Sequence, residues 1–120
     1  MHNHSLPHQH GQEIEKICDH MPQLQDFQVV SDIFKQMGDS SRVRIFWILC
    51  HCEECVINLS AMMEMSSPAV SHHLKQLKSS GLIISRREGK EVYYKASRTR
   101  QAELLHHMIE MLVEISCPNA

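Results

Sequence analysis

The sequence predicts a mostly α-helical chain with one small β-hairpin, and three observations support this prediction. Apolar residues recur at helical spacing in several segments, and Gly, Pro or helix-capping residues separate these segments. Two short strand-like runs flank a charged turn with a glycine at its tip, which is typical of a hairpin. The length of 120 residues corresponds to about one domain, so the chain holds one modest core.

Six helices are expected, and capping or helix-breaking residues define most of their ends. The helix at residues 42–50 is apolar almost all round, so it should be the central, buried one. Ser67 is a suitable N-cap, and Pro68 suits the first position of a helix that runs to about Ser80. The other helices are expected at residues 14–21, 27–37, 56–65 and 99–116, and the hairpin strands at residues 82–85 and 91–95.

The chain should consist of an arm, a folded domain and a short tail. Residues 1–11 are rich in His, Gln and Gly, which is typical of a mobile segment. With the first short helix they make a mobile His-rich N-terminal arm at residues 1–22. Residues 23–116 should form the folded domain, and residues 117–120 a C-terminal tail.

Composition excludes several classes of protein. No apolar run approaches the about 18 residues of a membrane span, and the N-terminus lacks a secretory signal, so we expect a cytoplasmic protein without a membrane partner. The five cysteines are an odd number, which favours metal binding, redox sensing or burial over disulfide bonds. An enzyme is not expected, because the sequence has no phosphate-binding glycine loop, no nucleophile elbow and no zinc-protease helix.

Positive charge is concentrated in one quarter of the chain, although the formal net charge is -2. Residues 68–100 contain eight of the 12 Lys and Arg residues and only two of the 14 acidic residues. Such a patch attracts phosphate groups, as in a nucleic-acid backbone.

The helix that begins near Ser67 has the pattern of a DNA-reading helix. Val70, Leu74 and Leu77 form its buried stripe, so a polar, donor-rich face points outward. Such a face suits base edges and phosphates in a major groove, and the helix N-terminus adds free backbone N–H groups. Together with the preceding helix and the basic hairpin it predicts a winged helix-turn-helix, whereas the alternative is a solvated basic face on an ordinary helix. The predicted DNA-binding residues are Ser71, His72, Lys75 and Gln76 on the helix and Arg86, Arg87 and Lys90 on the hairpin.

Three segments resemble the motifs of one family. Residues 38–45 look like its GD-x-[ST]-R-x-[RK]-I pattern, residues 68–77 are similar to its Ser-His-His-Leu recognition-helix signature, and residues 81–94 resemble its wing. The chain is thereby identified as similar to the ArsR/SmtB-type family of bacterial metalloregulatory repressors. The resemblance implies a homodimer made by the first and last helices. It also implies binding to double-stranded operator DNA, with Ser67 among the contacts, and release when an inducer, often a metal ion, binds.

The resemblance also offers two metal sites. The ligand positions of a site between the last helices fall on Arg98, Arg100, Met111 and Glu114, and arginine does not bind a cation, so we expect that site to be lost. In a second, thiolate site, Cys55 matches the first family cysteine and Ile57 replaces the second. Cys18 lies in the arm that supplies a further ligand in the family.

The spacing Cys52-x-x-Cys55 itself suits chelation of one tetrahedral ion. Thiolates select a thiophilic inducer such as cadmium, zinc, lead or arsenite. We therefore predict a metal site at Cys18, Cys52 and Cys55, where His51 or a histidine of the arm could fill a fourth position. The alternative is that these are reduced cysteines packed as small hydrophobic groups, which is also what we expect of Cys50.

Three further possibilities stay open. His106 with Glu110, and Glu103 with His107, are four residues apart and form either chelating pairs or solvated faces. A repressor of the same fold that senses oxidants or persulfides would use Cys50 or Cys52 with Cys117. A metal-storage protein would use the His-rich arm, but it would need neither the recognition helix nor the wing. His73 lies beside the apolar stripe and should be a hydrogen-bonded core histidine rather than a ligand.

Overall fold

The computed structural model of the protein describes residues 6–117, so the outermost residues of the predicted arm and tail, 1–5 and 118–120, lie outside the described part. The chain divides into two compact units, Met1–Ser31 and Asp32–Ala120. The predicted arm lies wholly within the first unit. None of the helices formed by residues 6–117 combines the length and the apolar character that a membrane span needs.

The first unit contains α1 (Ile14–His20) and the larger part of α2 (Leu24–Gln36). Pro22 lies between the two helices, where its missing N–H does no harm. The Asp26 carboxylate accepts a hydrogen bond of 2.9 Å from the backbone N–H of Gln23, which ties down the first turn of α2. Cys18 is the buried residue of α1.

Three helices form the core of the second unit: α3 (Ser40–His51), α4 (Val56–Met63) and α5 (Ser67–Ser79). The Asp39 side chain caps α3 by accepting from the backbone N–H of Arg42 at 3.0 Å. The prediction that α3 is central is confirmed, because Ile45 and Phe46 have no exposed surface. Among the apolar residues of this helix, Trp47 is the exposed one, with 40% of its surface exposed. The core is completed by Leu59 of α4, by Val70, Leu74 and Leu77 of α5, and by Leu82 and Ile83.

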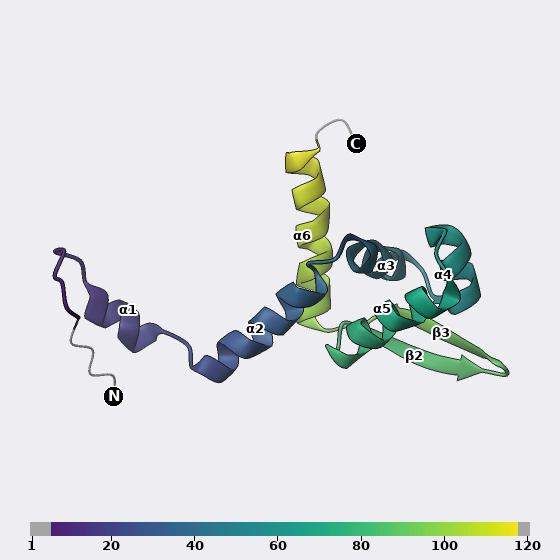
Figure 1. Ribbon diagram of the computed structural model, residues 1–120, viewed down its shortest axis with the longest axis horizontal. Coiled ribbons are helices and arrows are strands. Elements are labelled where there is room, and N and C mark those ends of the chain that lie inside the picture. The colour runs from purple at the N-terminus through teal and green to yellow at the C-terminus, as the bar shows by residue number, and fades with distance from the viewer. Residues whose placement is uncertain (1–5, 118–120) are drawn as a thin grey trace. The chain divides into compact units, whose positions relative to one another are not determined.

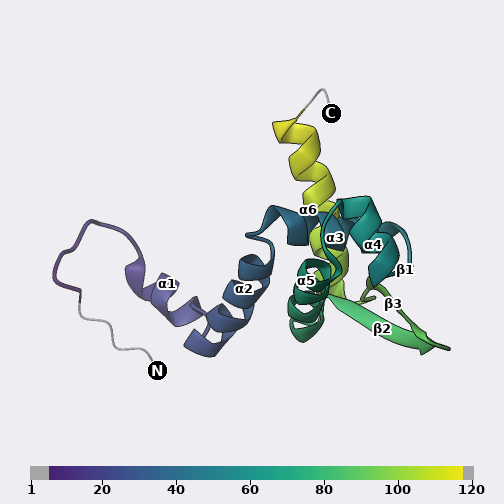
Figure 2. The same cartoon turned by 45° about the vertical axis from the view of Figure 1, so that its right-hand side comes forward.

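The predicted hairpin is present, but it belongs to a three-stranded sheet. β2 (Ile83–Glu88) and β3 (Glu91–Ala96) are antiparallel, and Gly89 at their turn has φ 62°, a left-handed value that favours glycine. The two-residue strand β1 (Glu54–Cys55) pairs with the other edge of β3, with Cys55 opposite Tyr93. Sequence periodicity missed β1, because two residues carry no alternation and their partner lies about forty positions away. The hairpin extends beyond the helices of this unit in both views (Figures 1 and 2).

The last helix, α6 (Arg100–Ser116), begins at the Thr99 N-cap and contacts the core through Ala102 and Leu105. Most of its remaining apolar side chains are exposed, so they add nothing to the core of one chain. These are Leu104, Met108, Met111, Leu112, Val113 and Ile115.

Several expected boundaries were wrong by one to three residues: α2 begins at Leu24 rather than at residue 27, and β2 ends at Glu88 rather than at residue 85. Two further differences, at α5 and α4, have local causes. The N-cap of α5 is Ser66, whose hydroxyl accepts from the backbone N–H of Ala69, so Ser67 is already helical and Pro68 takes the second position. α4 ends at Met63 rather than at residue 65, because Glu64 adopts a left-handed conformation with φ 54°. Both differences arise from local backbone geometry near a helix end, where the apolar pattern gives little information.

Candidate nucleic-acid interface and metal-ligand clusters

The helix α5 presents a polar face to solvent because its apolar stripe is fully used in the core. Val70, Leu74 and Leu77 are at most 1% exposed. On the opposite side Ser71, His72 and Lys75 are exposed, and Gln76 is half-buried at the edge of this face. Ser67 lies in the first turn of α5, where its hydroxyl shares a hydrogen bond of 3.1 Å with the Ser60 hydroxyl of α4. The face therefore carries the predicted donors at the spacing of a helix that enters a major groove.

His73 lies on the flank of the same helix and takes part in an internal contact. Its Nδ1 is 3.4 Å from Nη1 of Arg42, whose Nε donates to the Gln36 carbonyl at 3.0 Å. Burial lowers the pKa of His73, and the nearby Asp39 carboxylate partly offsets this. The residue therefore connects α5 to the start of α3 rather than facing outward.

The three basic residues predicted on the wing are in different situations. Arg87 and Lys90 are exposed. Arg86 is held by two carboxylates, with Nη2 at 2.6 Å from Glu53 Oε1 and Nη1 at 2.7 Å from Glu88 Oε2. Its guanidinium also lies over the Tyr93 ring, 4.9 Å from the centroid. The charge of Arg86 is thus matched within the chain, whereas those of Arg87 and Lys90 face solvent.

The hydrogen bonds from Arg86 also change the chemistry of Glu53. They hold the pKa of the Glu53 carboxyl below its ordinary value, so this group stays ionised at any pH near neutrality. Sequence reasoning missed Glu53, because it lies 33 residues from Arg86 and no local spacing connects them.

The predicted thiolate ligands differ in their surroundings. Cys52 is exposed, and its thiol donates to the Ile48 carbonyl at 3.4 Å, whereas Cys55 is buried at the end of β1. Among residues 6–117, neither of them belongs to a group of three potential ligand atoms within 4.8 Å of one another. Cys18 is buried in the other unit of the chain.

Cys50 is the thiol most affected by its surroundings. Burial raises its pKa to about 11, and the negative charge of Glu110 contributes to the same effect. A thiol that stays protonated at neutral pH is a weak nucleophile, so this environment does not favour Cys50 as a reactive sensor.

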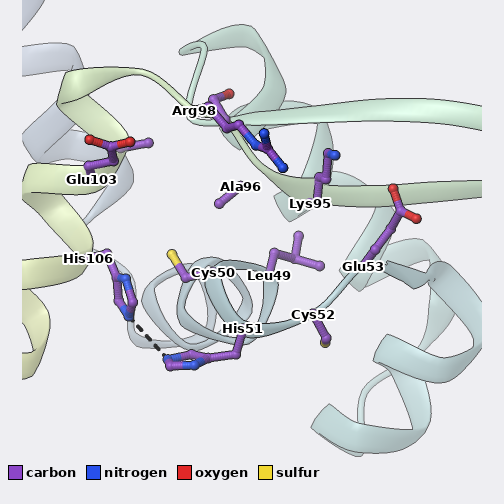
Figure 3. Close-up of a pocket in the computed structure, with 12 residues that line it drawn as sticks. Leu49, Cys50, His51, Cys52, Glu53, Lys95, Ala96, Arg98, Glu103 and His106 are labelled. Carbon is purple, nitrogen blue, oxygen red and sulfur yellow. Dashed lines mark hydrogen bonds between the residues drawn. The ribbon is translucent and has the colours of Figure 1, made fainter.

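A different group of potential ligands comes together between α3 and α6. Nε2 of His51, Nε2 of His106 and Oε1 of Glu110 all lie within 4.8 Å of one another. Figure 3 shows the His51 and His106 rings pointing toward each other from the two helices, beside Cys50. Sequence spacing suggests His106 with Glu110 as a pair, but it does not connect His51 to them. One sequence signal could have suggested the cluster. Trp47 and His51 are four residues apart on α3, and His106 and Glu110 are four residues apart on α6, so each helix carries a polar or aromatic pair.

Comparisons with known proteins agree with this architecture. A family model described as "Bacterial regulatory protein, arsR family" matches residues 39–85. A transcriptional repressor SmtB homolog from a Synechocystis species is 32% identical over 105 residues, which cover 88% of this chain and 80% of that protein. The chain belongs to the arsR family of bacterial regulatory proteins.

Other arsR-family relatives and solved structures are similar to this chain over most of its length. The arsenic resistance transcriptional regulator ArsR2 of Pseudomonas putida is 32% identical over 84 residues, which cover 69% of this chain and 72% of that one. The structure of HlyU from Vibrio cholerae has a TM-score of 0.67 at 29% identity and covers 79% of this chain and 99% of its own. A Mycobacterium bovis domain described as a winged helix-turn-helix has a TM-score of 0.68 at 23% identity, and the match covers 92% of this chain and 94% of that domain. The predicted winged helix-turn-helix is confirmed.

Proposed function

We propose that this protein is a cytoplasmic transcriptional repressor that binds double-stranded operator DNA as a homodimer and is released by a thiophilic metal ion. The observation that carries the proposal is the outward face of α5, whose exposed Ser71, His72 and Lys75 stand beside a projecting wing with exposed Arg87 and Lys90. Side chains of this kind read base edges in the major groove, while the wing cations neutralise phosphates. The relatives described as repressors support the same function.

The DNA contacts divide into two kinds. Ser71, His72, Lys75 and Gln76 are the candidates for base and phosphate contacts in the groove, and Ser67 is near the phosphate at the helix start. Arg87 and Lys90 supply free positive charge on the wing. Arg86 acts mainly by fastening the wing, because Glu53 and Glu88 already match its charge.

The exposed apolar side chains of α6 support the homodimer. Leu112 and Ile115 are 55% and 71% exposed, and a single chain gains nothing from leaving them in water. A second copy packed on α6 would bury both stripes around a twofold axis, which is the commonest symmetry of soluble oligomers. Two recognition helices related in this way would reach half-sites about one helical turn of DNA apart.

The identity of the effector rests on the relatives and on the cysteines. A cadmium resistance regulator CadC homolog from Staphylococcus aureus is 41% identical over 66 residues, which cover 54% of each chain, and other relatives are named for arsenic resistance. Thiolates at Cys52 and Cys55, joined by Cys18, have the softness that cadmium, zinc, lead and arsenite select. We place the inducer there. The arm that carries Cys18 would close on the ion when it binds.

The test measures operator affinity and its decrease on metal addition. A selection from a pool of random duplexes defines the operator, and fluorescence anisotropy then follows release by zinc, cadmium, lead and arsenite in turn. Cys55→Ser should bind the operator as tightly as wild type and fail to release it, whereas Cys50→Ser should respond like wild type. Absence of any selected DNA would overturn the repressor function. Release of Cys55→Ser at the wild-type metal concentration would overturn the thiolate site alone.

A further inference from the structure

The contact between α3 and α6 brings three potential ligand atoms to one point. Nε2 of His106 lies 3.1 Å from Nε2 of His51 and 3.1 Å from Oε1 of Glu110. The third side of this triangle, from His51 Nε2 to Glu110 Oε1, measures 3.3 Å. All three residues belong to the second unit of the chain. The atoms therefore form a nearly equilateral triangle.

Hydrogen bonding alone does not satisfy this triangle. The carboxylate oxygen only accepts, and each histidine Nε2 either carries one hydrogen or accepts one. If both nitrogens carry hydrogens, the contact between the two rings has no acceptor. If only one does, the other nitrogen faces the carboxylate with lone pairs on both sides. With the Glu110 carboxyl ionised, at least one of the three short contacts is not a hydrogen bond, whichever histidine nitrogens carry hydrogens.

A tetrahedral metal ion satisfies all three contacts at once. Around an ion with ligand bonds of about 2.0–2.1 Å, neighbouring ligand atoms lie about 3.3–3.4 Å apart. The observed sides of 3.1–3.3 Å differ from this by a few tenths of an ångström at most. We propose that His51, His106 and Glu110 form a binding site for a divalent ion of the zinc class, including cobalt and nickel.

The composition of the cluster selects this class of ion. Two imidazoles and one carboxylate suit zinc, cobalt and nickel, whereas magnesium and calcium prefer oxygen ligands only. The side chains of His51, His106 and Glu110 are 45%, 31% and 48% exposed, so a fourth position is open to water. A site with three protein ligands and one open position exchanges its ion more readily than a closed structural site, which suits a sensor.

Trp47 supports the cluster from behind. Its indole Nε1–H donates to Glu110 Oε1 at 3.1 Å, and the centroid of its ring lies 4.2 Å from the centroid of the His51 ring. This bond, followed by those with His106 and His51, lowers the pKa of the Glu110 carboxyl. Outer partners of this kind fix the orientation of ligands in known metal sites. Trp47 is the single tryptophan of the chain, so it also reports on the site by fluorescence.

The site lies on the side of α6 that a partner subunit would leave open. At about 100° per residue, His106 and Glu110 project from the face opposite Leu104, Met108 and Ile115. An ion held there would join α3 to α6 within one chain. Because α3 also packs against α5, the ion would couple the last helix to the DNA-reading helix, and this consequence rests on the proposed function.

The test uses Trp47 fluorescence during titration with zinc chloride, without DNA. The chain should carry Cys18→Ser, Cys52→Ser and Cys55→Ser, so that the three thiolates of the other proposed site do not contribute. We expect a saturable change in emission that His51→Gln, His106→Gln and Glu110→Gln each weaken. Removal of an outer partner already costs about 10- to 100-fold in metal affinity, so removal of a direct ligand should cost at least that much. The matched control is His107→Gln, which removes an exposed histidine next along the same helix and should leave the midpoint unchanged.

Cobalt gives a second measurement that does not depend on Trp47. A tetrahedral cobalt spectrum without a thiolate charge-transfer band should appear in the triple-serine chain and vanish in His106→Gln. Titrations with the same midpoint in the triple-serine chain and in all three ligand variants made from it would overturn the site. The site would also be overturned if Trp47 emission changed on acidification but never on addition of zinc. That result would show that the three side chains share a proton instead of binding a metal ion. Because these measurements omit DNA, they distinguish failure of the site from failure of the repressor function.

Discussion

Glu53 and Arg86 form a fork-like ion pair between the segment before β1 and the middle of β2. Nε of Arg86 donates to Glu53 Oε2 at 2.9 Å, and Nη2 donates to Oε1 at 2.6 Å. Two parallel bonds of this kind are geometrically specific as well as strong. The pair fastens the wing to the connection between α3 and α4, and it leaves Arg87 and Lys90 as the free cations at the wing tip.

This relationship predicts unequal effects of wing mutations on DNA binding. Replacing Arg87 and Lys90 together by Ala should make the dependence of log affinity on log salt concentration shallower by about 1.8, or about 0.9 for each phosphate that is no longer neutralised. Arg86→Ala should change this slope by less, because its charge is already matched by Glu53 and Glu88. Anisotropy at several salt concentrations measures both slopes, with Lys16→Ala as a control for removal of a charge elsewhere. A larger change for Arg86→Ala than for the double variant would contradict this assignment.

The recognition helix should determine sequence preference rather than general affinity. Ser71→Ala and His72→Ala should each weaken operator binding by about 1–3 kcal/mol, the usual value of a good base contact. Binding to unrelated DNA should change much less, because phosphate contacts supply that affinity. The comparison of selected and scrambled duplexes measures the difference. Both side chains are exposed, so thermal unfolding should stay as in wild type, and an equal weakening on both duplexes would remove these residues from base recognition.

The Glu53–Arg86 pair should also make the stability of the folded protein depend on pH in the acid range. The ordinary pKa of a Glu carboxyl is 4.5, and in the folded state Arg86 holds the pKa of Glu53 below this value. The pair therefore stabilises the fold fully above pH 4.5, and this stabilisation is lost as the pH falls through the lower pKa of the folded state. Wild type should therefore lose more stability than Glu53→Gln between about pH 5 and pH 3. Thermal unfolding midpoints across this range measure the effect. Glu103→Gln is the matched removal of an exposed carboxylate, and parallel curves for wild type and Glu53→Gln would show that the pair does not stabilise the fold.

The exposed face of α6 predicts the oligomeric state. Leu112→Glu with Ile115→Glu should convert a dimer into a monomer, because burying two carboxylates in an apolar interface is costly. Sedimentation velocity at micromolar concentration measures the change, and circular dichroism should show that the helical content is kept. His107→Gln lies at the edge of this face and keeps a polar side chain there, so this variant should remain dimeric. A wild-type protein that sediments as a monomer would show that this face is not a dimer interface.

Helix patterns were the most predictable part of the fold. The stripe of Val70, Leu74 and Leu77 is buried as predicted, and Asp39 caps α3. These features depend on neighbours three or four residues apart, so the local sequence contains the whole signal. The strand β1 was missed because its pairing with β3 joins residues about forty positions apart.

The sequence by itself determined the winged helix-turn-helix, the polar face of α5 and the basic wing, because each arises from spacing within an element and from the order of neighbouring elements along the chain. Only the tertiary structure decided that Arg86 is matched by Glu53 while Arg87 and Lys90 stay free. It alone brought His51 of α3 against His106 and Glu110 of α6. Such contacts depend on how two elements pack, and packing is set by the shape of the whole core rather than by the residues that happen to meet at its edge.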